Sequence, residues 1–164
     1  MTGGVQMRPA TNADAPALWD MLKPVFHAGD TYAVDPAIPR DAALEFWCGG
    51  THAAYVAERD GPVLGSYYLC PNQQGGGAHV CNCGFVTAQA AQGQGVARAM
   101  LEDALARAKA EGYRAMQFNF VVATNARAVA TWQRYGFEIV GRLPGAFLHP
   151  KAGYVDALVM YRVV

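Results

Sequence analysis

Residues 87–98 read Thr-Ala-Gln-Ala-Ala-Gln-Gly-Gln-Gly-Val-Ala-Arg, and this stretch says more about the fold than any other. It follows an apolar run that ends at Thr87 and precedes a long amphipathic pattern, so it predicts a strand, a short glycine-rich turn and a helix. Gly93 and Gly95 remove side chains where backbone N–H groups must approach a ligand closely. Because the unpaired N–H groups and positive dipole of a helix start favour negative charge, the segment predicts an anion-binding turn.

Three kinds of phosphate ligand compete for such a turn. A P-loop requires Gly-Lys-Ser/Thr before the helix, whereas this chain has Gly95-Val96-Ala97. A dinucleotide fold requires a third glycine where Arg98 stands, and an acidic residue about 20 residues later that the expected strand end lacks. The candidate left is a pyrophosphate that carries a long arm, such as coenzyme A.

Outward from this turn, the hydrophobic pattern predicts about seven strands and four helices in an α/β (α+β) fold. The strands are expected at residues 5–8, 53–59, 63–70, 79–87, 116–122, 137–143 and 155–161. The helices are expected to begin after Asn12 or Asp14, at Arg40, after Gly95 and at Asn125. A hairpin in the first half and strand–helix–strand units in the second half predict a mixed sheet.

Composition limits the class of protein. A chain of 164 residues with 52% hydrophobic and 16% charged residues is typical of one well-packed domain, expected over residues 1–164. Thirteen basic and 13 acidic residues cancel without clustering, which argues against a nucleic-acid partner. No apolar run is long enough to cross a bilayer and the first residues do not resemble a signal peptide, so a cytoplasmic protein without a membrane partner is expected. The four cysteines lack zinc-ligand spacing, which predicts buried, reduced thiols and no metal site.

Three motifs in register resemble the GNAT superfamily of acyl-CoA-dependent N-acyltransferases. Gln92-x-x-Gly95-x-Ala97 resembles the Arg/Gln-x-x-Gly-x-Gly/Ala signature of that family. The other two are Arg8-Pro9-Ala10-Thr11 followed by Asp14 and a helix, and Asn125-x-x-Ala128 with Gly136-Phe137 before a strand. The resemblance implies a single N-acetyltransferase domain with a splayed sheet, acetyl-CoA as cosubstrate, and transfer of acetyl to the amine of a small molecule.

The resemblance also implies where acetyl-CoA binds. Its pantetheine arm is expected to insert between the fourth and fifth strands. Backbone groups of Phe85, Val86 and Thr87 are expected to pair with the pantetheine amides, as an added half-strand does. The residues expected to hold the pyrophosphate are Gln92, Gly93, Gln94, Gly95, Val96, Ala97 and Arg98, and Asn125 is expected near the arm or the adenosine.

Two departures from the family concern catalysis. Members often carry a Tyr seven residues after the Asn of the fourth helix, thought to protonate the leaving thiolate, but this chain has Trp132. An indole N–H is not a usable acid, and the nearest phenol, Tyr135, lies at another helical angle, so the acid is left unassigned. The Glu often found on the fourth strand is also absent from residues 79–85. A water-mediated route, His79 or an amine already neutral at the site must then serve as base.

Asn119 is the residue predicted to act in catalysis and substrate binding. It interrupts an apolar strand, where we expect it to be buried near the splay, and burying an unpartnered amide costs on the order of 1–3 kcal/mol. Asn82, on the preceding strand, is expected to face the same end of the cleft. The alternative for both is that each closes a backbone hydrogen bond at the splay. Tyr32 and His79 complete the predicted substrate-binding residues.

Within the superfamily, residues 118–125, Trp132 and residues 153–157 most resemble the group that acetylates proline analogues such as azetidine-2-carboxylate. This resemblance implies a small amino acid as acceptor. Two other classes stay open: a non-catalytic acyl-CoA-binding sensor, which the missing Glu and Trp132 favour, and a structural protein whose glycines only make turns. The identity of the acceptor amine, the acyl-chain length and the oligomeric state, a homodimer included, are also open.

Overall fold

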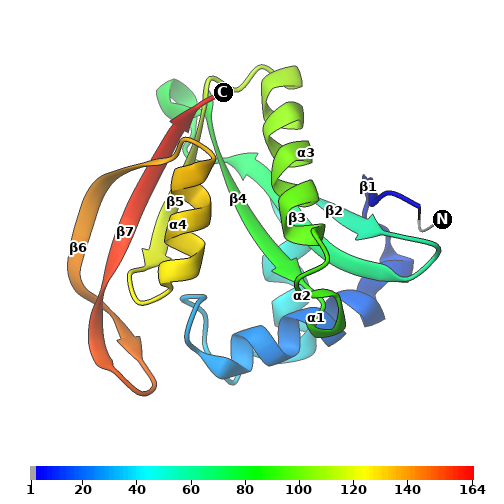
Figure 1. Cartoon of the computed structure of the whole chain (residues 1–164), viewed down its shortest axis with the longest axis horizontal. Helices are drawn as coiled ribbons and strands as arrows, with labels where there is room; N and C mark the ends of the chain where they lie inside the picture. The colour runs from blue at the N-terminus through cyan, green and yellow to red at the C-terminus, as the bar shows by residue number, and fades with distance from the viewer. Residues whose placement is uncertain (1–2) are drawn as a thin grey trace.

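The computed structural model describes residues 3–164, which form a sheet of seven strands with helices on both faces (Figure 1). The strands are β1 (Gln6–Pro9), β2 (Ala53–Glu58), β3 (Val63–Pro71), β4 (Val80–Thr87), β5 (Ala115–Val122), β6 (Glu138–His149) and β7 (Gly153–Val163). The α-helices of these residues are α1 (Ala15–Ala28), α2 (Arg40–Cys48), α3 (Val96–Ala110) and α4 (Ala126–Arg134). Both the number of strands and the number of helices agree with the prediction.

The strands lie in the order β1-β2-β3-β4-β5-β7-β6. β1, β2, β3 and β4 are successive antiparallel neighbours; short connections join β2 to β3 and β3 to β4, whereas the chain passes through α1 and α2 between β1 and β2. The crossover through α3 returns the chain to the same edge, so β5 pairs with β4 in parallel. β7 then lies antiparallel between β5 and β6. The mixed α/β sheet expected from the hydrophobic pattern is confirmed.

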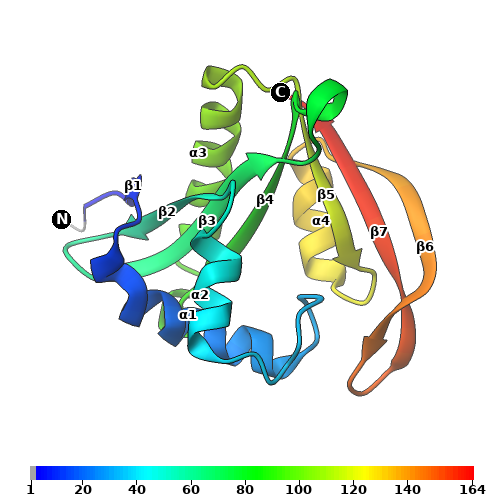
Figure 2. The same cartoon turned by 180° about the vertical axis from the view of Figure 1, so that it is seen from behind.

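β4 and β5 pair only where they begin. Val80 lies opposite Ala115 and Cys81 lies opposite Met116, and beyond these pairs the two strands diverge (Figures 1 and 2). Past the last pair, Asn82 Nδ2 donates to a β5 carbonyl oxygen, that of residue 117, at 2.9 Å. The expected splay is confirmed, and it leaves one edge of β4 without a strand neighbour.

Two hydrophobic clusters hold the helices against opposite faces of the sheet. α3 and α4 pack on one face through a cluster that includes Phe118 and Trp132. α1 and α2 pack on the other face through a cluster that includes Trp47 and Tyr68. Figures 1 and 2 show the two faces in turn. Burial of apolar surface holds the helices on each face of the sheet. The sheet therefore stays packed although β4 and β5 share only two paired positions.

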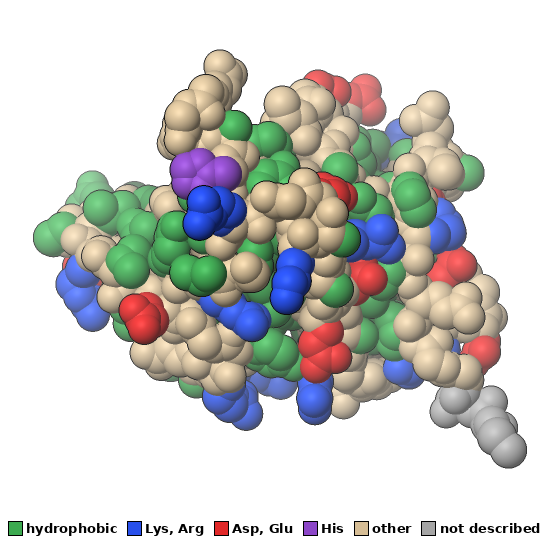
Figure 3. Space-filling model, turned by 90° about the horizontal axis from the view of Figure 1, so that it is seen from above, with side chains coloured by type: hydrophobic (Ala, Val, Ile, Leu, Met, Phe, Trp, Pro, Cys, Tyr) green, Lys and Arg blue, Asp and Glu red, His purple; other side chains and the backbone are tan. Residues whose placement is uncertain are grey.

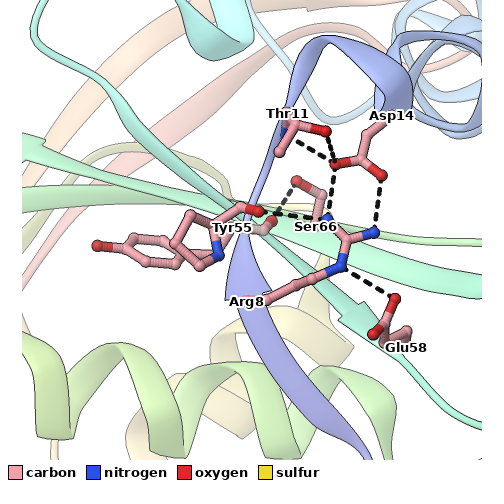
Figure 4. Close-up of polar contacts among 7 residues, drawn as sticks. Arg8, Thr11, Asp14, Tyr55, Glu58 and Ser66 are labelled. Carbon is pink, nitrogen blue, oxygen red and sulfur yellow. Dashed lines mark hydrogen bonds and ion pairs between the residues drawn. The ribbon is translucent and has the colours of Figure 1, made fainter.

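A buried carboxylate fixes the junction between β1 and α1 (Figure 4). Arg8 donates to both oxygens of Asp14 at 2.9 Å and to Glu58 at 3.1 Å. Asp14 is only 6% exposed, and the hydrogen bond from Arg8 lowers the pKa of its carboxyl group. A buried carboxylate is stable only with such partners, so this ion pair sets the direction of α1 and of the loop that follows it.

β6 is longer than predicted, because it runs to His149 rather than ending at residue 143. Pro144 and Gly145 resemble a turn in the sequence. Here they lie at a register shift in the pairing of β6 with β7, and the N–H of Gly145 donates to Asp156 at 2.9 Å. β6 is an edge strand, and an edge strand tolerates a proline because the missing N–H can face away from the sheet.

Three further observations concern the surface and the cysteines. Basic and acidic side chains are interspersed on the face shown in Figure 3. Within residues 3–164, no helix combines the length and apolar character needed to cross a bilayer. All four cysteines are free thiols, and three are buried as expected, but Cys48 is exposed because it ends α2 at the surface.

Candidate functional site

The divergence of β4 from β5 opens a cleft of about 1010 Å³. Its walls come from β4, β5, the start of α3, α4 and the loop between α1 and α2, which lies at the open end of the divergence (Figure 1). The predicted site residues that line it are Tyr32, Asn82, Phe85, Val86, Thr87, Gln92, Gly93, Gly95, Val96, Ala97, Arg98, Asn119 and Asn125. Two predicted residues, His79 and Gln94, do not line it.

The α3 end of the cleft is a turn built from main-chain groups. Gly93 and Gly95 have φ of 77° and 80°, in the left-handed region that glycine adopts most readily. A Cβ atom on either glycine would meet nothing within 4 Å, so the turn faces open space. Ala99 donates to the Gly95 carbonyl, and the N–H groups before Ala99 have no helical partner. The geometry therefore fits the anion that the sequence predicts there.

Arginines are the charged side chains that line the cleft within residues 3–164: Arg98, Arg127 and Arg134. Arg98 donates to Glu102 at 2.9 Å, whereas the exposed Arg127 and Arg134 form no salt bridge in the described chain. All three belong to α3 or α4, so the positive charge of the described lining lies on the wall that these two helices form. Arg127 and Arg134 were not predicted as site residues, although their spacing of seven places them on one face of the helix.

Asn125 has a structural role at this end of the cleft. It is the N-cap of α4, and its Oδ1 accepts from the N–H of Ala128 at 3.3 Å. The side chain also lines the cleft, as predicted for a residue near the arm or the adenosine. The cap leaves the Asn125 amide nitrogen as the group that a ligand can reach.

A phenol binds the open edge of β4. Tyr32 Oη donates to the carbonyl oxygen of Phe85 at 2.8 Å and accepts from the N–H of the same residue at 2.9 Å. Burial raises the pKa of Tyr32, so the phenol stays protonated at neutral pH. The Phe85 backbone groups therefore face the gap between the strands, and the Tyr32 hydroxyl is engaged with them rather than free for a substrate.

Side-chain amides gather where β4 and β5 part. Asn119 Nδ2 donates to Asn72 Oδ1 at 2.6 Å, and Gln117 Nε2 donates to Asn119 Oδ1 at 2.9 Å. The bond from Asn82 to the Gln117 carbonyl gives Asn82 the backbone-closing role that the sequence analysis held as its alternative. Each of these amides keeps part of its hydrogen-bonding capacity for another partner.

Asn119 and His79 differ from expectation. Asn119 is exposed rather than buried, because β5 has already left β4 at that point and its pairing with β7 shifts register between Phe118 and Val121. His79 precedes β4 at the paired end of the two strands, where its carbonyl oxygen accepts from the N–H of Arg114. Since His79 lies outside the cleft lining, its predicted role in substrate binding is not supported.

The two aromatic residues considered as acids take other positions. Trp132 packs against Phe85 and Phe118 with ring centroids 5.5 and 4.6 Å away, and so forms an apolar wall. Tyr135 donates to Glu102 at 3.0 Å, toward α3. The cleft lining contributed by residues 3–164 also contains no carboxylate. The described lining therefore offers no carboxylate base, and the Tyr135 phenol, which also lines the cleft, is engaged with Glu102.

Comparison with known proteins places this site in a family. Residues 16–137 match the profile of the Acetyltransferase (GNAT) family. The chain is similar in structure to a GCN5-related N-acetyltransferase from Kribbella flavida, with a TM-score of 0.91 and 44% identity over 98% of each chain. It also shares its fold with yncA from Salmonella typhimurium, solved with its cofactor acetyl-CoA, with a TM-score of 0.83 and 19% identity over 98% of this chain and 94% of that one.

One curated relative is similar in sequence. N-acetyltransferase aca1 of Schizosaccharomyces pombe is 34% identical over 98 residues, which cover 59% of this chain and 47% of that protein. The matched region therefore spans about half the length of that relative.

Proposed function

The chain belongs to the acetyltransferase (GNAT) family, and from this premise we propose that it transfers acetyl from acetyl-CoA to the amine of a small molecule. We also propose that residues 1–164 act as a single N-acetyltransferase domain. One observation carries the proposal: a glycine turn at a helix start and the open edge of β4 line the same cleft.

The α3 end of the cleft suits the pyrophosphate of acetyl-CoA. The N–H groups of Val96, Ala97 and Arg98 have no helical partner at the start of α3, and Gly93 and Gly95 keep the space in front of the turn clear. The arginines of α3 and α4 add positive charge beside the turn. We assign backbone groups of Phe85, Val86 and Thr87 to the pantetheine amides and Asn125 to the arm or the adenosine.

The other end of the cleft suits a neutral amine. Acetyl-CoA supplies a thioester carbonyl, which only an amine with a free lone pair can attack. Val34, Phe46 and Phe120 line this end, and apolar surroundings disfavour an ammonium ion. We assign Asn119 to orient the amine through an uncharged amide, with Asn82 beside it, since neither group stabilises an ammonium ion as a carboxylate would.

A small amino acid is the acceptor that we favour. This rests on the resemblance of residues 118–125 and 153–157 to enzymes that acetylate proline analogues. The aromatic and amide lining described above suits a compact acceptor with one apolar side. The neutral lining also agrees with recognition through hydrogen bonds rather than ion pairs.

A second candidate is an acyl-CoA sensor that binds without turnover. Two observations favour it: the cleft lining within residues 3–164 has no carboxylate, and Trp132 occupies the position at which the family often has a tyrosine. Such a protein would bind acetyl-CoA but leave the thioester intact in the presence of amines.

The two candidates separate in one assay. We expect wild-type protein with acetyl-CoA to release free thiol only when an amine is added, and a panel of small amino acids should include the best acceptor. Calorimetry with CoA measures binding in parallel. Binding without amine-dependent thiol release would favour the sensor, and absence of both would remove the proposal.

A further inference from the structure

The ring of Tyr68 lies across β4 at the splayed part of the sheet. Tyr68 on β3 is the register partner of Gly84 on β4. A Cβ atom on Gly84 would sit 2.4 Å from Tyr68 Cε1 and 2.9 Å from Tyr68 Oη, so no larger residue fits. Gly84 therefore serves packing, and it brings the Tyr68 hydroxyl directly over β4, where the residue lines the cleft.

Three aromatic rings hold this phenol in place. His52 stacks on Tyr68 with centroids 4.0 Å apart, and Trp47 and Phe46 meet it edge-on at 4.9 and 6.4 Å. The residue is 6% exposed, so the hydroxyl cannot swing into bulk water. No residue of 3–164 forms a hydrogen bond with it. Burial also raises the pKa of Tyr68, which makes the group a donor rather than a base at neutral pH.

Thr31 brings a second hydroxyl to the cleft. Its Oγ1 is buried without a hydrogen-bond partner in the described chain, and the residue lines the same cleft. The bonds of the neighbouring Tyr32 to Phe85 fix this part of the loop. A buried polar atom without a partner is rare in native proteins, so Thr31 Oγ1 points to a ligand group at this part of the cleft, and the Tyr68 hydroxyl lines the same cleft.

The surroundings limit what that ligand can be. The charged groups of the described lining, Arg98, Arg127 and Arg134, all lie on α3 or α4, so this end offers neutral donors alone. Asn82 and Asn119 each spend one N–H on the protein. Hydroxyl and amide donors, with no carboxylate side chain of the protein beside them, suit a ligand that carries an anionic acceptor such as a carboxylate group. Hydrogen bonds to a charged acceptor are stronger than those to a neutral one.

We propose that Tyr68, assisted by Thr31, is a specificity-determining residue that donates a hydrogen bond to the carboxylate of an α-amino acid acceptor. The proposal rests on the proposed acetyl transfer and deepens it. It assigns the carboxylate to Tyr68 and Thr31 and leaves the amine to Asn119.

The test uses matched acceptors and isosteric variants. Azetidine-2-carboxylate and azetidine differ by the carboxylate, as do proline and pyrrolidine, and thiol release at saturating acetyl-CoA gives KM and kcat for each. Tyr68→Phe should raise KM for the amino acids at least about tenfold, because a hydrogen bond to a charged group is lost. Thr31→Val should act in the same direction, and neither variant should change KM for azetidine or pyrrolidine.

Tyr67→Phe is the matched control, since it removes the adjacent phenol on the opposite face, where Tyr67 donates to Asp103. It should leave every KM unchanged, and melting temperatures report any loss of folding. Equal changes for both members of an acceptor pair, or no change, would overturn the role of Tyr68. The role of Tyr68 would also be overturned if the wild-type protein preferred the amines that lack a carboxylate, or acetylated no α-amino acid. Either result would leave the proposed acetyl transfer to other amines intact. No thiol release with any amine would remove the proposed function itself.

Discussion

The two ends of the cleft recognise ligands in different ways. The α3 end uses main-chain N–H groups at a glycine turn, with exposed arginines nearby. The end beneath the α1–α2 loop uses side chains, namely hydroxyls and amides set among aromatic rings. At the first end a local segment of 12 residues suffices. At the second, groups from the α1–α2 loop, β3, β4 and β5 must be brought together by the whole fold.

This difference teaches where each end is vulnerable. Main-chain donors survive every substitution except proline, so most substitutions damage the α3 end only by filling its space or straining its backbone. The other end depends on individual side-chain atoms, each of which a conservative variant deletes. Substitutions at the first end should therefore change CoA affinity, and substitutions at the second should change turnover or acceptor choice.

The largest effect is expected from Gly95→Ala. The left-handed backbone at Gly95 disfavours any Cβ atom by about 1–2 kcal/mol, and the added methyl group occupies the space that a phosphate needs. We expect CoA to bind about 100-fold more weakly, or ~2.7 kcal/mol, in calorimetry. Gly112→Ala is the control, because Gly112 has φ of 87° but lies outside the cleft lining. Equal CoA affinity in the two variants would show that no phosphate approaches Gly95.

Asn119→Ala tests the opposite end. We expect turnover to fall at least about tenfold, or ~1.4 kcal/mol of transition-state stabilisation, while CoA affinity stays near wild type. Because Asn119 is exposed, its loss should change the melting temperature little. Asn72→Ala removes the hydrogen-bond partner of Asn119 but keeps the reactive-site amide, so its effect should be smaller. Full turnover in Asn119→Ala would leave the residue with no role in catalysis.

The smallest effect is expected where the two ends meet, at Tyr32. Its phenol bonds the Phe85 groups that we assign to the pantetheine amides, so Tyr32→Phe should free them for acetyl-CoA. One or two additional neutral hydrogen bonds between Phe85 and acetyl-CoA should make CoA bind about fivefold more tightly. Calorimetry measures this, with Tyr154→Phe as an exposed control outside the cleft. Weaker binding would mean that Tyr32 supports the CoA site instead of competing for it.

The sequence predicted best what depends on neighbours in the chain. Gly93 and Gly95 lie between a strand and a helix, and both the left-handed turn and the free helix start follow from that order. The strand and helix pattern likewise predicted the mixed sheet, because hairpins and crossovers fix the direction of pairing. The splay between β4 and β5 came from the resemblance alone, since periodicity does not report where two strands separate.

Predictions failed where the outcome depends on distant partners. Asn119 has apolar neighbours in sequence, but its exposure depends on the divergence of β5 from β4. His79 belongs to the right strand region but to its paired end. Tyr68 was missed because its importance follows from the cross-strand partner Gly84, a relation that register alone reveals. Each failure involves a contact between segments that local pattern does not link.

The proline within β6 affects how the protein behaves when it is concentrated. β6 is an edge strand of 12 residues, and such edges can pair with other chains and start aggregation. Exposed apolar side chains on it, among them Ile139 and Leu148, increase this tendency. Pro144 has no N–H to donate and sits at an irregularity in the strand, so a second chain cannot build an unbroken ladder along the whole edge. The same feature that lengthens the strand beyond its apparent turn thus protects it against edge-to-edge aggregation.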